Sequence, residues 1–301
     1  MTRAMTRKIP GVNAAASTDL PVLLSHRALY ATPSEIGFSR WLANMPPWAP
    51  LMLVAVVALW PLTAAAQGTG YSTAKAFDAL WRWLPFLVFN GFVFTILISF
   101  MTMAIGTVLG VFLGLGQISP NRVTVKVSWF ITQVFRNSPW LVILFIVMLS
   151  FPFEIVIGGL IILVPDWMKA VIGLSLPVMA NISEIVRGAI NLVPTAQWEA
   201  SESLAFTRRQ TLFRIILPQC FKRMIPPWMN WYAILTMATP IVSILGVEEV
   251  LNLTRQAIEA EDNHPELLVP FYSFVLIIFF IYCYPIARLT VLLEKRFALK
   301  L

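Results

Sequence analysis

The sequence predicts an all-α polytopic membrane protein, and two features carry that prediction. Of its 301 residues, 58% are hydrophobic and only 12% are charged, with a mean hydropathy of +0.76. Soluble domains have about 25% charged residues, so this composition excludes an ordinary water-soluble globule. A helix needs about 20 apolar residues to cross the hydrocarbon, and runs near that length recur along the chain. They cover residues 50–66, 84–115, 134–151, 167–193, 224–247 and 267–292.

The first run, 50–66, follows an N-terminal tail over residues 1–48. The tail contains Arg3, Arg7 and Lys8, but no apolar run comes directly behind them. A cleaved signal peptide has such a run, so we expect none here. The first run is therefore predicted to be a transmembrane helix.

The second run, 84–115, is longer than one crossing and is expected to tilt or to protrude. It contains Gly106, Gly110 and Gly114 at intervals of four. Small residues at this spacing let two helices approach closely, so we expect them to serve helix packing rather than substrate contact.

The third run, 134–151, precedes an apolar segment, 152–165, that also contains charged residues and paired glycines. This segment fits a re-entrant segment, an interfacial segment or a hydrophobic loop. The fourth run, 167–193, ends before Pro194, which has no N–H and stops a helix.

The last two runs are followed by a short C-terminal tail over residues 291–301, and the distribution of Lys and Arg orients them all. Cytoplasmic loops are rich in these residues. With a cytoplasmic N-terminus, 17 of the 22 Lys and Arg lie on the cytoplasmic side, only four lie outside, and Arg187 lies within a run. Both termini are thus predicted to be cytoplasmic. The same bias explains the net charge of +7 without a nucleic-acid partner, and we expect none.

The loop between the fourth and fifth runs is polar and basic, yet compact. Thr195 can cap a helix there. Glu199 and Glu202 are expected in the early turns of that helix, where its dipole favours negative charge.

The same short helix has one face of small or apolar residues. Ala200 and Leu204 share that face at i, i+4 spacing, with Ala205 alongside. The pattern predicts a helix that lies in a groove on another protein. A helix resting on lipid headgroups is the alternative, and the arginines of the loop would allow it.

Four sequence motifs, which follow one another along the chain in the family's order, resemble motifs of the bacterial ABC importer permeases of the polar amino acid (histidine/glutamine-type) family. The loop resembles their EAA loop through Glu199-Ala200-Ser201, Ala205, Ile215, Leu217 and Pro218. The other motifs are Asn90-Gly91 with Thr95-Ile96, Phe135-Arg136-Asn137-Ser138-Pro139, and Ser183-Glu184-Ile185-Val186-Arg187-Gly188-Ala189-Ile190 leading into Gln197-Trp198-Glu199-Ala200.

The resemblance implies a five-span ABC type-1 importer transmembrane domain over residues 90–290, with 50–66 as an extra N-terminal span. It implies a coupling loop over 195–218, whose ATPase-coupling residues are Glu199, Ala200, Ser201, Leu204, Ala205 and Arg208. The implied function is that of a permease subunit that translocates a polar amino acid, or an amino-acid-like solute, across the bacterial inner membrane.

The resemblance also implies partners. These are a cytoplasmic ABC ATPase dimer that holds ATP and Mg, a second permease subunit (identical or homologous), an extracytoplasmic solute-binding protein and membrane lipid.

The sequence departs from the family pattern at three places. Ala205 replaces the loop glycine, and Ala196 replaces the glycine before Gln197. Met237-Ala238-Thr239-Pro240 stands where relatives have Lys-Asp-Thr-Ser, in a run expected to line the pathway. The last departure bears on which solute is carried.

Polar residues within the apolar runs are candidates for contact with solute. They are Asn181, Ser183, Thr236 and Thr239. They could hydrogen-bond a solute or bond neighbouring helices. Glu184 and Arg187 lie at i, i+3, and the cost of a charge in the membrane predicts that they pair. We favour a structural ion pair over a gate or a contact with a zwitterionic solute.

Other classes of function find little support. The sequence has no Gly-x-x-x-x-Gly-Lys-Ser/Thr loop, so we expect neither ATP hydrolysis nor a bound cofactor on this chain. His26 and His264 have no acidic or Cys companions at ligand spacing, so no metal site is expected. The alternative, a secondary transporter or channel for small solutes, would need charges at mid-depth for ion coupling, which the runs nearly lack.

Overall fold

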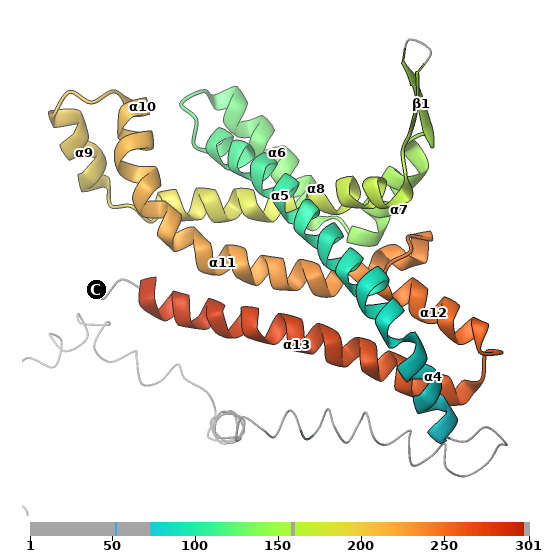
Figure 1. Ribbon diagram of the computed structural model, residues 1–301. Coiled ribbons are helices and arrows are strands. Elements are labelled where there is room, and N and C mark those ends of the chain that lie inside the picture. The colour runs from blue at the N-terminus through green and yellow to red at the C-terminus, as the bar shows by residue number, and fades with distance from the viewer. Residues whose placement is uncertain (1–51, 53–72, 158–159, 298–301) are drawn as a thin grey trace, which may run out of the picture. The chain divides into compact units, whose positions relative to one another are not determined.

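The computed structural model describes residues 52, 73–157 and 160–297, and it is nearly all helical (Figure 1). The predicted tail 1–48 and almost all of the predicted extra span 50–66 lie outside the described residues. Four of the described helices are long and apolar enough to cross a membrane. A bent pair of helices adds a fifth span if the pair is counted as one crossing. That range agrees with the predicted five-span core.

The first spanning helix is longer than the run 84–115 indicated. It joins α4 (Thr73–Phe86), the π-helix η2 (Leu87–Phe92) and α5 (Val93–Gln117), and the spanning stretch covers Ala74–Gln117. These 44 residues exceed one crossing, as expected, so the helix has to tilt or to protrude.

The third predicted span, 134–151, is not one continuous helix. The structure has instead α6 (Arg122–Asn137) and α7 (Trp140–Ser150), which meet at an angle of 104°. The reason is Pro139: its ring disfavours the helical region for Ser138, which is extended at φ −89° and ψ 142°.

The segment after α7 is a β-hairpin, a departure from the all-helical expectation. Strand β1 (Glu154–Ile157) pairs antiparallel with β2 (Leu160–Leu163). Most of the paired residues are Ile or Val, which favour strands. Two glycines lie between the strands in the sequence, which is a hairpin signal that the hydropathy profile masks.

Helix α8 (Asp166–Asn191) is the centre of the bundle. Of the residues in its apolar stretch 72% are buried, against 28–33% in the other three spanning helices. Its most extensive contact is with α5, which crosses it in Figure 1. The predicted packing role of the α5 glycines is confirmed, because a Cβ at Gly106 or Gly110 would lie 2.5 Å from Val178 Cγ1 or 2.7 Å from Ile182 Cβ.

The remaining elements lead from the loop to the C-terminus. They are α9 (Thr195–Ser203), α10 (Arg208–Gln210), the π-helix η3 (Thr211–Ile216), α11 (Leu217–Ala238), the 3-10 helix η4 (Thr239–Leu245), α12 (Val250–Ala260) and α13 (Pro265–Phe297). From Arg208 to Leu245 they form one 38-residue spanning stretch, so the second half of the predicted loop 195–218 belongs to a helix. Helix α13 continues to Phe297, well into the predicted tail 291–301.

Candidate functional site

The candidate coupling site is the helix α9 with the turn that follows it (Figure 1). The start of α9 differs from the prediction. Pro194 occupies the N-cap position, and Thr195 is the first helical residue rather than the cap. No acidic residue lies in the first turn, so the helix dipole does not explain Glu199 or Glu202.

The end of α9 is closed by a Schellman motif. The N–H of Phe206 donates to the carbonyl of Ser201 at 3.1 Å, and the N–H of Ala205 donates to that of Glu202 at 2.9 Å. Ala205 has a φ of +59°, the left-handed conformation that glycine adopts without penalty. This geometry explains why glycine is the usual residue there.

A capping box starts the next helix. The backbone N–H of Gln210 donates to Thr207 Oγ1 at 3.4 Å, and the N–H of Thr207 donates to Gln210 Oε1 at 2.9 Å. The connection between the two helices is therefore only Leu204–Phe206 plus the cap. A turn this short, closed at both sides by hydrogen bonds, holds α9 in a fixed orientation.

The predicted docking face of α9 is open to a partner. Leu204 is 72% exposed, and Glu199, Ala200 and Ala205 are exposed as well. Ser201 is different: it is 3% exposed and donates to the carbonyl of Gln197 at 2.7 Å. Of the predicted coupling residues, Ser201 is therefore a buried residue that hydrogen-bonds within α9 and is not part of its exposed face.

Two side-chain hydrogen bonds tie the coupling site to the spanning helices. Gln219 Nε2, on α11, donates to Gln197 Oε1, on α9, at 2.7 Å. Arg208 Nη2 donates to the carbonyl of Ile118, which follows α5, at 3.2 Å. Gln197 thus joins α9 directly to α11, whereas Arg208 joins α10 to the end of α5. Gln197 belongs to the motif that leads into the loop, but Gln219 did not stand out in the sequence, because only the fold brings the two together.

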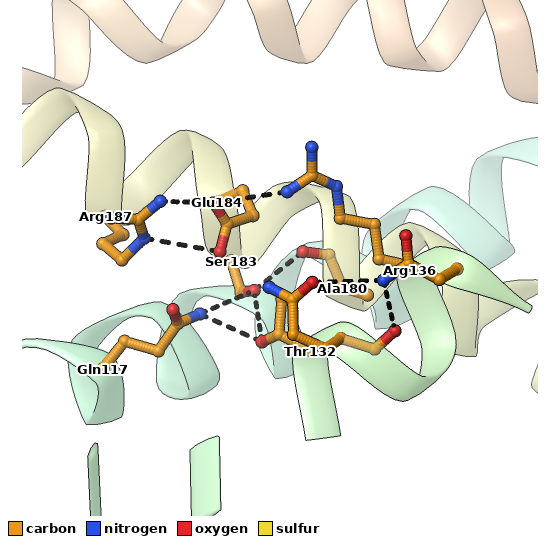
Figure 2. A network of polar contacts seen from close by, with 9 residues as sticks. Gln117, Thr132, Arg136, Ala180, Ser183, Glu184 and Arg187 are labelled. Carbon is orange, nitrogen blue, oxygen red and sulfur yellow. Dashed lines mark hydrogen bonds and ion pairs between the residues drawn. The ribbon is translucent and has the colours of Figure 1, made fainter. Parts of the chain in front are cut away.

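The predicted ion pair is present and has a third member (Figure 2). Arg187 Nη2 lies 2.6 Å from Glu184 Oε2, and its Nε lies 3.3 Å from Oε1. Arg136, near the end of α6, places its Nη1 3.6 Å from the same Oε2. The glutamate side chain is 17% exposed and the two arginines 46% and 40%. In the sequence Arg136 was only one residue of the motif that ends at Pro139. The packing of α6 against α8 brings it to Glu184.

Ser183 belongs to a buried polar cluster where α5, α6 and α8 meet (Figure 2). Gln117 Nε2 donates to Thr132 Oγ1 at 3.0 Å and to Ser183 Oγ at 3.2 Å, and the two hydroxyl oxygens are 2.9 Å apart. Ser183 also donates to the carbonyl of Ala180 at 2.7 Å. All three side chains of the cluster are buried, so these hydrogen bonds join helices.

The other candidate pathway residues bond to their own helices. Asn181 Nδ2 donates to the carbonyl of Pro177 at 2.8 Å, and Thr236 and Thr239 donate to carbonyls four residues back at 2.9 Å. Both threonines are fully buried, whereas Asn181 is half-buried. In this arrangement Asn181 is the most accessible of the four. Contact of any of them with solute stays a prediction.

Comparison with known proteins identifies the class. The chain belongs to the family of binding-protein-dependent transport system inner membrane components, whose sequence model matches residues 106–299. It is 31% identical over 236 residues to the L-cystine transport system permease protein TcyB of Bacillus subtilis, covering 78% of this chain and 95% of that protein.

Two further comparisons agree. The arginine transport system permease protein ArtQ of B. subtilis is 32% identical over 213 residues, covering 68% of this chain and 93% of that protein. An amino acid ABC transporter crystallised with histidines superposes with a TM-score of 0.62 at 24% identity, over 73% of this chain and 98% of that one. This likeness confirms the type-1 importer fold.

The protein is thus a multi-pass permease subunit of an ABC importer in the inner membrane, and a separate ATPase subunit hydrolyses ATP. It works in a complex with ATPase and permease partners. The alternative of a secondary transporter or channel is not favoured.

Proposed function

We propose that this chain translocates a polar amino acid, or an amino-acid-like solute, into the bacterial cytoplasm. The names of the relatives support this substrate class, since they transport cystine and arginine. An extracytoplasmic binding protein would deliver the solute, and a second permease subunit, identical or homologous, would complete the pathway. Both termini would be cytoplasmic, as the distribution of Lys and Arg predicts.

The observation that carries the coupling role is the attachment of the α9–α10 loop region to two spanning helices: Gln197 of α9 bonds to Gln219 of α11, and Arg208 of α10 bonds to Ile118 at the end of α5. In the proposed cycle, ATP and Mg close a cytoplasmic ATPase dimer around the exposed face of α9. The movement of α9 then shifts α11 and α5 relative to α8. ATP drives the switch because it binds the two states with different affinity.

For the charged cluster we propose a structural role. Glu184 is held by arginines from two helices, Arg136 of α6 and Arg187 of α8. Such a pairing fixes the bent α6–α7 unit to the central helix and offsets the cost of placing charge near lipid.

Reconstitution tests the proposal. The chain, purified with its ATPase and permease partners, would be placed in proteoliposomes with its binding protein, and uptake of labelled cystine, arginine, glutamine and histidine measured. We expect uptake of at least one that requires internal ATP. Uptake driven by an ion gradient without ATP would contradict the importer mechanism, and ATP-driven uptake of a solute unrelated to amino acids would contradict the substrate class.

A further inference from the structure

A cleft of about 760 Å³ lies behind the coupling site, between the α9–α10 loop and the turn that joins α5 to α6. A cavity of this size can hold a ligand of several hundred daltons. Much of its lining is apolar and comes from the ends of three spanning stretches: Leu115, Ile118, Ile190, Val193 and Leu212. Its polar lining includes Arg208 and Arg209.

The two arginines give the cleft an anion-binding character. Arg208 is positioned by its hydrogen bond to the carbonyl of Ile118, which leaves other N–H groups of its guanidinium available. Within the described part of the chain, neither Arg208 nor Arg209 has a carboxylate within 4.0 Å. A guanidinium pairs well with phosphate because its planar donors match two phosphate oxygens.

A third group in the lining lacks a partner. Thr211, at the start of η3, is 1% exposed, and its Oγ1 makes no hydrogen bond to any residue that the structure describes. A buried hydroxyl without a partner costs free energy, which a ligand oxygen would recover. Charge, an orphaned hydroxyl and an apolar floor thus meet in one cleft.

We propose that this cleft binds an anionic phospholipid. The phosphate would lie between Arg208 and Arg209, and the first carbons of the acyl chains would lie on the apolar floor. Glu202, which also lines the cleft, would accept hydrogen bonds from headgroup hydroxyls. A free phosphate would leave the apolar floor unused, so the lining favours a lipid. The cleft lies at the C-terminal ends of α5 and α8, which the orientation proposed above places on the cytoplasmic side, where the headgroups of the inner leaflet lie.

The bound lipid would bridge the coupling loop and the α5–α6 turn. It would thereby stiffen the connection through which α9 moves the spanning helices. The cleft shares Arg208 with the predicted coupling residues, but its lining does not include Ala200 or Leu204 of the exposed docking face.

Native mass spectrometry of the full chain in detergent tests the site without any transport reaction. A failed result would therefore leave the transport proposal intact. Titration would use phosphatidylglycerol, phosphatidylcholine with the same acyl chains, and soluble glycerol phosphate. We expect phosphatidylglycerol to bind at least tenfold more tightly than phosphatidylcholine, and glycerol phosphate not to compete.

Matched variants separate this site from general attraction to a basic loop. The double variant Arg208→Gln/Arg209→Gln should lose roughly ten- to a hundredfold in phosphatidylglycerol affinity. The variant Arg214→Gln removes a nearby charge, on η3, that lies outside the cleft lining, and should keep wild-type affinity. Thr211→Val retains both arginines and the side-chain volume. It should weaken phosphatidylglycerol binding several-fold while the lipid-free unfolding temperature stays equal or rises.

Several results would overturn the proposal. Equal affinity for the two lipids would remove the headgroup selectivity, and competition by glycerol phosphate would replace the lipid by a soluble anion. If the double variant and Arg214→Gln lost phosphatidylglycerol affinity equally, the binding would depend on net charge and not on this cleft. Unchanged phosphatidylglycerol binding in both the double variant and Thr211→Val, with loss of ATPase co-purification in the former, would make the cleft a seat for the ATPase.

Discussion

At the residue scale, Ala205 departs from the family motif, which has glycine at this position, and the departure places a Cβ on a left-handed residue. Its φ of +59° lies in the left-handed region, where a residue with a Cβ is disfavoured by about 1–2 kcal/mol. The Schellman bonds nevertheless form around it. The chain therefore carries strain at the turn that ends the coupling helix.

Ala205→Gly should relieve this strain. Glycine loses more conformational freedom on folding, so we expect a net gain of about 0.5–1 kcal/mol in the local opening free energy. Hydrogen exchange of the Ala205 and Phe206 amides would measure it. The same substitution at Ala200, within α9, should instead reduce protection by up to about 1 kcal/mol. Faster exchange in the Ala205 variant would contradict this account.

Glu184 is predicted to matter more than either arginine that it holds. Glu184→Gln leaves Arg136 and Arg187 facing each other without their shared anion. Because both arginines are partly exposed, water screens part of the loss, and we expect destabilisation of about 1–3 kcal/mol. Arg136→Gln keeps the closer pair and should cost less than about 1 kcal/mol. Thermal unfolding in detergent would compare them. Equal losses would show that the cluster does not act through Glu184.

Glu249 predicts a pH dependence of stability. This residue caps α12 outside the spanning helices, is fully buried, and accepts hydrogen bonds from Thr95 Oγ1 and from the N–H groups of Leu251 and Asn252. Burial raises its pKa from 4.5 to about 7, although these hydrogen bonds oppose the rise. Because the folded state holds the proton more tightly than the unfolded state, the contribution to stability is fully present below about pH 4.5. It is lost as the pH rises through about 7.

The unfolding temperature should therefore fall between pH 5 and pH 8, with a free-energy loss on the order of 2 kcal/mol. Glu249→Gln keeps an acceptor at the cap without the titrating proton, so it should remove most of this slope. A variant with the wild-type slope would assign the pH dependence to other groups.

At the element scale, the fold depends on the close crossing of α5 and α8. A Cβ at Gly110 would lie 2.7 Å from Ile182 Cβ and 2.8 Å from the carbonyl oxygen of Met179. Because one of these atoms belongs to the backbone, a rotamer change cannot relieve the overlap. The helices themselves would have to separate.

Gly110→Ala should therefore destabilise the chain by about 1–3 kcal/mol, despite the better helix propensity of alanine. Gly188 offers a matched control within α8, because a Cβ there meets nothing within 4 Å. Gly188→Ala should be neutral or stabilising by up to about 1 kcal/mol. Thermal unfolding of the two purified variants would decide, and equal stability would mean that the crossing tolerates side chains.

At the scale of the whole molecule, coupling is expected to depend on the exposed charge of α9. Glu199 is exposed and makes no ion pair within the described residues, so Glu199→Lys should leave the fold intact. Its reversed charge would oppose a basic groove on the ATPase. We expect solute-stimulated ATPase activity of the assembled complex to fall at least tenfold.

Glu294→Lys supplies the control, because it makes the same charge change on the exposed surface of α13. It should keep wild-type stimulation and uptake. If Glu199→Lys behaved like this control, Glu199 would have no part in coupling, and Leu204 would become the first candidate for the docking contact.

The sequence by itself predicted the helical membrane architecture, the class of the protein and a short helix after Pro194. Composition and apolar run length indicate the architecture because a bilayer requires apolar side chains over a set thickness. The class and the predicted coupling role followed from the four motifs that resemble the permease family. The sequence also anticipated the Glu184–Arg187 pair and the glycine packing of α5, since both depend on helical spacing alone.

Only the tertiary structure decided the bend at Pro139, the hairpin after α7, and the contacts that join Arg136 to Glu184 and Gln197 to Gln219. These depend on which helices become neighbours, and contacts between residues far apart in the chain leave no periodic signal in one sequence. The predicted docking face rests on local spacing. The hydrogen bonds that join α9 to α11 and α10 to the end of α5, and the cleft behind α9, depend on the packing of the whole bundle.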